Sequence, residues 1–135
     1  VLLSTCNRTE FIYRSEHNGK DKILNFLVNY GSTPINELKE YLYVIDEFEA
    51  LQHMFRVSSG LNSLVIGETQ ILGQVKTAFE DAMDRKTSGN NFLQIYQQIL
   101  QCAKAVRRGT DIGKGSLSVS FIAVQLARNI FSLSV

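Results

Sequence analysis

The sequence predicts an α+β fold, with strands near the start of the chain and helices after them. Two observations predict it. The first 45 residues hold short apolar and β-branched runs typical of strands, whereas from residue 46 apolar residues recur every three or four positions. At 135 residues, 44% of them hydrophobic, the chain suits one domain with a core. We expect an α+β part over about residues 1–45 and a helical part over about residues 46–135.

Three strands and one helix are predicted in the α+β part. Residues 1–6 and 9–14 are rich in apolar, aromatic and β-branched side chains, so both are predicted strands. Asp21 caps a predicted helix that runs to about Tyr30. A loop around Pro34 follows, and the run Tyr-Leu-Tyr-Val-Ile at residues 41–45 is a third strand candidate.

The helical part begins with two helices separated by a glycine-containing break. Asp46, with Glu49 three residues later, resembles a capping box that starts a helix through Val57. Residues 58–63 break this helix. The next helix carries an apolar stripe over residues 71–83 with helical spacing.

Two further helices are predicted towards the end of the chain. Asn90 or Asn91 caps the first of them, which ends at residues 107–109, where two arginines meet the negative end of the helix dipole. Ser116 or Ser118 opens the last helix.

Charge and cysteine content exclude several classes of protein. A formal net charge of +1 excludes nucleic-acid binding by bulk electrostatics, so any such contact must be a local patch. The two cysteines lie far apart without Cys/His spacing, so no disulfide framework or metal site is predicted and a cytoplasmic location is the default. No apolar run approaches the roughly 18 residues that a membrane helix needs.

The pentapeptide Ser-Thr-Cys-Asn-Arg at residues 4–8 is the strongest candidate for chemistry. It puts the thiol of Cys6 where a strand ends, close to Arg8, and a nearby cation favours the nucleophilic thiolate. Arg8 can also hold an anionic substrate. The alternative is that Cys6 is a small core residue with no chemical role.

Two other segments carry candidate site residues. His53 lies in a predicted helix and is either a structural histidine or a partner of the cysteine in acid–base chemistry. Residues 59–70 are dense in glycine and small polar groups, which suits either close approach to a ligand or an ordinary helix-to-helix connection. Gln70 and Gln74 share one helix face, where they can hold a polar substrate or face solvent.

Three long runs of sequence together match one family. LSTCNRTEFIY, HMFRVSSGLNSLVIGETQILGQVKTAF and KAVRRGTDIGKGSLSVSFIAVQLA occur in this order over nearly the whole chain. The chain resembles the N-terminal catalytic domain of glutamyl-tRNA reductase. This resemblance implies an oxidoreductase that reduces glutamyl-tRNA to glutamate-1-semialdehyde with NADPH through a cysteine thioester. That reaction is the first step of the five-carbon route to tetrapyrroles, the porphyrin and haem pathway.

The resemblance also assigns roles to particular residues. Cys6 is the implied thioester nucleophile and His53 the activity-sensitive histidine. The implied substrate-binding residues are Thr5, Asn7, Arg8, Ser63, Glu68, Thr69, Gln70 and Gln74. Two positions depart from the family pattern: Asn62 replaces a common aspartate, and Thr69 stands where proline is common.

The resemblance further implies that this chain is a fragment. The strand and helix that open the family's domain, the NADPH-binding domain and the C-terminal dimerisation helices are missing, and no GxGxxG motif occurs. We therefore expect a partial ferredoxin-like βαβ subdomain followed by a helical subdomain. We also expect thioester formation without reductase activity. Implied partners are glutamyl-tRNA, a second subunit of the parent enzyme, and the aminomutase that follows in the pathway; no membrane is implied.

Two other functions fit the residues alone. One is a helical module that binds tRNA or protein and has a structural cysteine. The other is a cysteine hydrolase such as an amidase, which needs a group to orient the histidine and an oxyanion hole, and no sequence pattern indicates either. Thiol reactivity separates the first alternative from covalent catalysis, because a buried structural thiol alkylates slowly.

Overall fold

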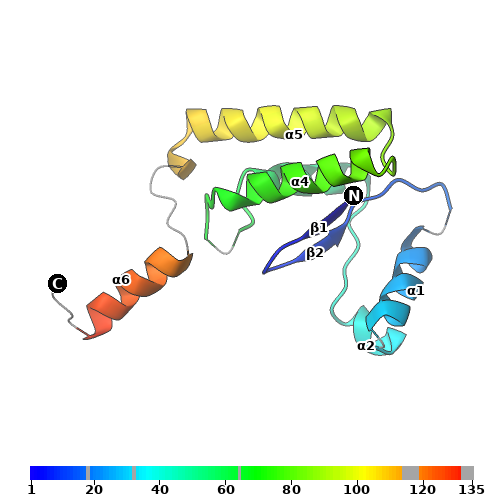
Figure 1. The fold of residues 1–135 in the computed structure, drawn as a ribbon, viewed down its shortest axis with the longest axis horizontal. Coiled ribbons are helices and arrows are strands. Elements are labelled where there is room, and N and C mark those ends of the chain that lie inside the picture. The colour runs from blue at the N-terminus through cyan, green and yellow to red at the C-terminus, as the bar shows by residue number, and fades with distance from the viewer. Residues whose placement is uncertain (18, 32, 64, 114–118, 132–135) are drawn as a thin grey trace.

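The computed structural model describes residues 1–17, 19–31, 33–63, 65–113 and 119–131. Its elements in chain order are β1 (Leu2–Ser4), β2 (Thr9–Phe11), α1 (Gly19–Gly31), α2 (Ile35–Lys39), α3 (Glu47–Ser58), α4 (Gln70–Asp84), α5 (Asn90–Gly109), a 3₁₀ turn (Asp111–Gly113) and α6 (Val119–Phe131). Figure 1 shows the small sheet beside α4, with α5 on the far side of α4. A two-stranded antiparallel sheet with helices confirms the predicted α+β class.

The sheet is a hairpin whose register decides which side chains face the core. Leu3 pairs with Glu10, and Ile12 donates its N–H to the carbonyl of Val1 at 2.9 Å before the chain turns away. Both strands are therefore shorter than predicted. Leu3 is buried at 3% exposure, and directly opposed residues share one face, so Glu10 also points to the core side.

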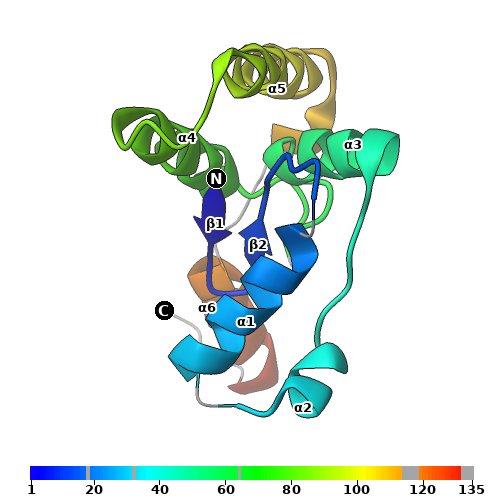
Figure 2. The ribbon, with the colours of Figure 1, turned by 90° about the vertical axis from the view of Figure 1, so that its right-hand side faces the viewer.

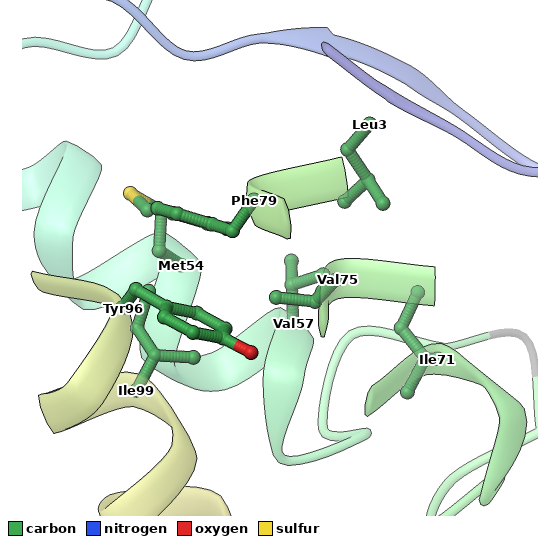
Figure 3. Packing of buried hydrophobic residues seen from close by; sticks show 8 residues of the cluster. All are labelled: Leu3, Met54, Val57, Ile71, Val75, Phe79, Tyr96 and Ile99. Carbon is green, nitrogen blue, oxygen red and sulfur yellow. The ribbon is translucent and has the colours of Figure 1, made fainter. Parts of the chain in front are cut away.

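The core lies between α3, α4 and α5, with the hairpin on one side (Figure 2). Its apolar stripes recur with the spacing that predicted these helices. Figure 3 shows the cluster that they form, namely Leu3, Met54, Val57, Ile71, Val75, Phe79, Tyr96 and Ile99. This packing fixes α3 and the hairpin relative to each other, and these two elements carry most of the candidate site.

The aromatic pair Phe79 and Tyr96 joins α4 to α5. Their rings stack with centroids 5.3 Å apart, and the Tyr96 hydroxyl donates a hydrogen bond to Oε1 of Glu80 at 3.2 Å. Burial, followed by the charge and hydrogen bond of Glu80, raises the pKa of Tyr96 above its ordinary value. The phenol is thus held in its neutral form at the α4–α5 contact.

The predicted third strand is wrong. Residues 41–45 connect α2 to α3 without strand pairing, and the side chains of Tyr41 and Tyr43 are 78% and 71% exposed. β-propensity reports how well a side chain packs on a pleated surface, and no neighbouring strand in the described ranges offers one here. The expected βαβ unit is therefore wrong too, because the two described strands form a hairpin that precedes α1.

Several predicted helix starts also need correction. Asp46 is the N-cap of α3, but its side chain makes no capping hydrogen bond, so the capping box is wrong. Gly89, not Asn90 or Asn91, is the N-cap of α5, and its carbonyl accepts the first helical N–H groups. The first helix begins at Gly19, two residues before Asp21.

Two predictions on the end of the chain have different outcomes. Ser116 and Ser118, the predicted starts of the last helix, lie outside the described residues, and α6 begins at Val119. Among the helices in the described ranges, none combines the length and the apolar character needed to cross a bilayer.

Candidate functional site

Cys6 lies at the tip of the β1–β2 hairpin, in the turn from Thr5 to Arg8. The side chains of Cys6 and Asn7 are exposed. Thr5 donates its backbone N–H to the Arg8 carbonyl at 2.9 Å. The hydroxyl oxygen of Thr5 accepts the N–H groups of Asn7 at 3.2 Å and Arg8 at 3.1 Å. One threonine side chain thus organises the turn that presents the thiol to solvent.

Arg8 folds back from the turn towards the hairpin and the loop after α3. Its Nη1 lies 3.3 Å from Oε1 of Glu10, and its Nη2 donates to the backbone carbonyl of Asn62. The side chain is only 17% exposed. A guanidinium carries more N–H donors than these two contacts use, so the anchored group retains donors for a ligand.

Glu10 connects Arg8 to the predicted histidine. Its Oε1, besides contacting Arg8, lies 2.9 Å from Nε2 of His53 on α3. The side chains of Glu10 and His53 are 14% and 17% exposed, which strengthens polar contacts by excluding water. Two of the predicted site residues, Arg8 and His53, therefore meet on one carboxylate.

Sequence reasoning missed Glu10, because its role depends on the register of the hairpin. In the structure Glu10 stands directly opposite the buried Leu3. An acidic residue at a core-facing strand position needs a partner. Its position therefore indicates a buried polar contact.

Two glycines form a backbone contact across the loop between α3 and α4. Gly60 and Gly67 have φ of +80° and +81°, and the N–H of Gly67 donates to the Gly60 carbonyl at 3.0 Å. A Cβ at Gly67 would lie 1.9 Å from the carbonyl oxygen of Ile112. Close backbone approach was predicted here, and in the structure the approaching group is the chain itself.

Two arginines brace this loop from the helices. Nε of Arg56 on α3 donates to Oδ1 of Asn62 at 3.1 Å, and Nη2 of Arg107 on α5 donates to the Glu68 carbonyl at 2.8 Å. Asn62 therefore contacts Arg56 through its side chain and Arg8 through its backbone carbonyl.

Among the described residues, the remaining predicted site residues make no hydrogen bond to Arg8, Glu10 or His53. Ser63 and Glu68 are half-buried in the loop, and Thr69 is the N-cap of α4. Gln70 and Gln74 are exposed on α4, each one position before a core residue of the stripe. The described contacts join Thr5, Arg8 and His53, and they do not join Cys6 or the two glutamines to that network.

A sequence model described as the glutamyl-tRNA(Glu) reductase N-terminal domain matches residues 1–110 of this chain. The chain belongs to this family. The resemblance inferred from the three sequence runs is thereby confirmed.

Curated glutamyl-tRNA reductases from distant bacteria match almost the whole chain. The enzyme of Pseudomonas savastanoi pv. phaseolicola is 47% identical over 132 residues, 98% of this chain and 31% of the relative. The enzyme of Pseudomonas putida strain F1 is 44% identical over the same span, and that of Bacillus velezensis is 43% identical over 133 residues, 97% of this chain and 29% of the relative. The chain thus spans less than a third of the length of the glutamyl-tRNA reductases that it matches.

The described part of this reductase-family chain does not fit the dinucleotide cofactor that the family resemblance implies. A dinucleotide site needs a strand, a glycine-rich turn and a helix in one parallel unit, and the strands described here form an antiparallel hairpin. Within the same ranges, no three His, Cys, Asp or Glu side chains are grouped to hold a metal ion.

A groove on the described part of this glutamyl-tRNA reductase family member lies away from the cysteine turn. A volume of about 730 Å³ opens between residues 12–17 and the α4–α5 loop at residues 87–92. None of the predicted site residues lines it. The chemistry of the cysteine turn, not the size of a cavity, therefore defines the candidate site.

Proposed function

We propose that this chain is the glutamyl-accepting catalytic domain of a glutamyl-tRNA reductase, an oxidoreductase of haem biosynthesis. The observation that carries the proposal is the hairpin tip, where an exposed thiol stands two residues from an anchored arginine in a chain of this family. The substrate of the whole protein is glutamyl-tRNA, and the product is glutamate-1-semialdehyde.

The step assigned to this chain is transfer of the glutamyl group from tRNA to Cys6. The Cys6 sulfur attacks the ester carbonyl carbon, a carbon–sulfur bond forms, and the bond to the ribose oxygen breaks. The thiol proton passes through His53 to the departing ribose hydroxyl, so no oxidant or reductant takes part. The thioester accepts a hydride more readily than the ester, because sulfur donates less electron density into the carbonyl.

Arg8 is the proposed carboxylate clamp for the glutamyl side chain. A planar guanidinium binds a carboxylate through paired N–H donors, and Arg8 is pre-oriented by Glu10 and Asn62. The other proposed substrate contacts are Thr5, Asn7, Ser63, Glu68, Thr69, Gln70 and Gln74. Among these, Glu68 is assigned to the α-ammonium group of the glutamyl moiety.

The remaining functions belong to the whole protein. NADPH would be held by other residues of the whole protein and would supply hydride there, and the described residues would contribute the bound glutamyl group. We further propose that the whole protein is a dimer and passes its product to the aminomutase that follows. Residues 1–135 act as one domain in this assembly and do not reduce the substrate alone.

Covalent labelling tests this proposal. The full-length protein is incubated with tRNA carrying radiolabelled glutamate, without NADPH, and quenched in acid. The wild type and Cys102→Ser should retain label on the protein, and Cys6→Ala should retain none. Cys102 is the matched control, because it is a half-buried cysteine on α5.

Deacylation of the tRNA gives a second readout. In the absence of NADPH, water should hydrolyse the thioester, so the wild type should release glutamate faster than Cys6→Ser. Equal labelling of the wild type and Cys6→Ala, or equal deacylation by the wild type and Cys6→Ser, would contradict the proposal and favour a binding module with a structural cysteine.

A further inference from the structure

Five residues form a contact network that joins the hairpin to α3. His53 contacts Glu10, Glu10 contacts Arg8, Arg8 contacts the Asn62 carbonyl, and the Asn62 side chain contacts Arg56. His53 and Arg56 lie one turn apart on α3, so this contact network begins and ends on the same helix face. Glu10 is the only carboxylate among these five residues, and the proposed acyl transfer uses it to orient Arg8 but assigns it no role towards His53.

We propose that Glu10 is a positioning residue that keeps a proton on Nε2 of His53, so that Nδ1 is the basic nitrogen of the imidazole whenever it carries a single proton. The role of His53 in the reaction rests on the proposed function. The position of the proton on the His53 imidazole does not.

The distance decides which nitrogen carries the proton. A neutral imidazole has one N–H donor and one lone-pair acceptor, and a carboxylate only accepts. With Nε2 at 2.9 Å from Oε1 of Glu10, a lone pair on Nε2 would face an oxygen lone pair, which is repulsive. The proton therefore lies on Nε2, and Nδ1 carries the lone pair.

Glu10 can fix the position of this proton because its own carboxylate is fixed by neighbouring groups. The same oxygen lies 3.3 Å from Nη1 of Arg8, and the strand register keeps the side chain opposite Leu3 on the core-facing side. The contact is largely shielded from water, so it is stronger than a similar contact at the surface. When Nδ1 takes the thiol proton during acyl transfer, the carboxylate stabilises the imidazolium that forms.

Nitrogen NMR shows directly which imidazole nitrogen of His53 carries the proton. Histidine labelled with ¹⁵N is incorporated into the full-length protein, and the signals that disappear in His53→Gln are assigned to His53. At alkaline pH the wild type should show a protonated, pyrrole-type Nε2 and a pyridine-type Nδ1 at His53. Glu10→Ala should give averaged shifts from both tautomers. A wild-type proton on Nδ1 would overturn the proposal, whatever the outcome of the labelling experiment.

A double-mutant cycle tests whether Glu10 acts through the histidine. Single-turnover acylation of Cys6 is measured in the full-length protein at saturating glutamyl-tRNA. We expect Glu10→Ala to slow it by about 10- to 100-fold, part of the roughly 10²–10⁴-fold that general acid–base catalysis contributes. In a His53→Ala background the same substitution should slow it by less than about twofold.

Controls separate this effect from unfolding and from failure of the proposed function. Glu10→Gln keeps an acceptor oxygen and should lose less activity than Glu10→Ala, and Glu37→Ala, at an exposed carboxylate of α2, should lose none. An equal loss from Glu10→Ala in both backgrounds would overturn the proposal. If no variant is labelled at Cys6, the proposed function fails, and the NMR result alone decides the role of Glu10.

Discussion

At the scale of single residues, the Thr5 hydroxyl shapes the turn that carries the thiol. It accepts two backbone N–H groups that the hairpin ladder does not pair. The structure joins Thr5 to Asn7 and Arg8, and Arg8 to His53 through Glu10, and the roles that the family resemblance implies for these residues stay predictions. Glu10 was not predicted, because its role depends on a strand register that brings it opposite Leu3 and towards α3.

Thr5→Val tests the role of this hydroxyl. The substitution keeps the branched shape and leaves the N–H groups of Asn7 and Arg8 without their acceptor, so we expect a loss of about 1–2 kcal/mol in the free energy of unfolding. Urea denaturation measures it. Thr77→Val on the exposed face of α4 is the control and should change stability by less than about 0.5 kcal/mol. Equal stability of the two variants would contradict the role assigned to Thr5.

Gly67 carries a second prediction at this scale. Gly67→Ala places a Cβ 1.9 Å from the Ile112 carbonyl oxygen at a φ of +81°, so we expect a loss of at least about 2 kcal/mol in unfolding free energy. Gly73→Ala on α4 is the matched control, because open space surrounds Gly73 and alanine favours the helix by about 0.5–1 kcal/mol. Chemical denaturation of both variants should therefore give changes of opposite sign.

At the scale of elements, periodicity predicted the helices far better than composition predicted the strands. The stripes of α4 and α5 require burial on one face, and the core of Figure 3 supplies it. The run at residues 41–45 has high strand propensity, yet a strand needs a partner that the run itself cannot specify. The N-cap of α5 at Gly89 was likewise not predicted, since a capping side chain is only one of several ways to satisfy the N–H groups at the start of a helix.

The α4–α5 contact gives a pH-dependent prediction. Because the pKa of Tyr96 is raised in the folded state, the native protein binds this proton more tightly than the unfolded chain. Its contribution to stability is full below about pH 10, the ordinary tyrosine value, and is lost as pH rises through the folded pKa. Urea denaturation from about pH 9 to pH 11 should show a fall that is shallower in Tyr96→Phe and Glu80→Gln.

The control for this prediction is an exposed tyrosine. Tyr30 on α1 is 83% exposed, so Tyr30→Phe should leave the alkaline fall unchanged. If the unfolding free energy falls as steeply with pH in Tyr96→Phe as in the wild type, groups other than Tyr96 cause the fall.

At the scale of the whole molecule, the three-helix core and the hairpin form the frame that positions the cysteine turn. The hairpin contacts α4 through β1, and Leu3 is its buried member (Figures 2 and 3). The family was recognisable from the sequence because its three long motifs are continuous runs. The meeting of Arg8, Glu10 and His53 depends on tertiary packing, and no single run of sequence contains it.

The anchoring of the hairpin by Leu3 has a consequence for temperature. A two-stranded hairpin is marginally stable in water by itself, so the turn with Cys6 is only as ordered as its packing on the helices. Local openings of such a small unit require less free energy than global unfolding. On warming, the proposed acylation of Cys6 should therefore be lost before the helices melt, and the gap between these two temperatures measures how strongly the packing of Leu3 stabilises the hairpin.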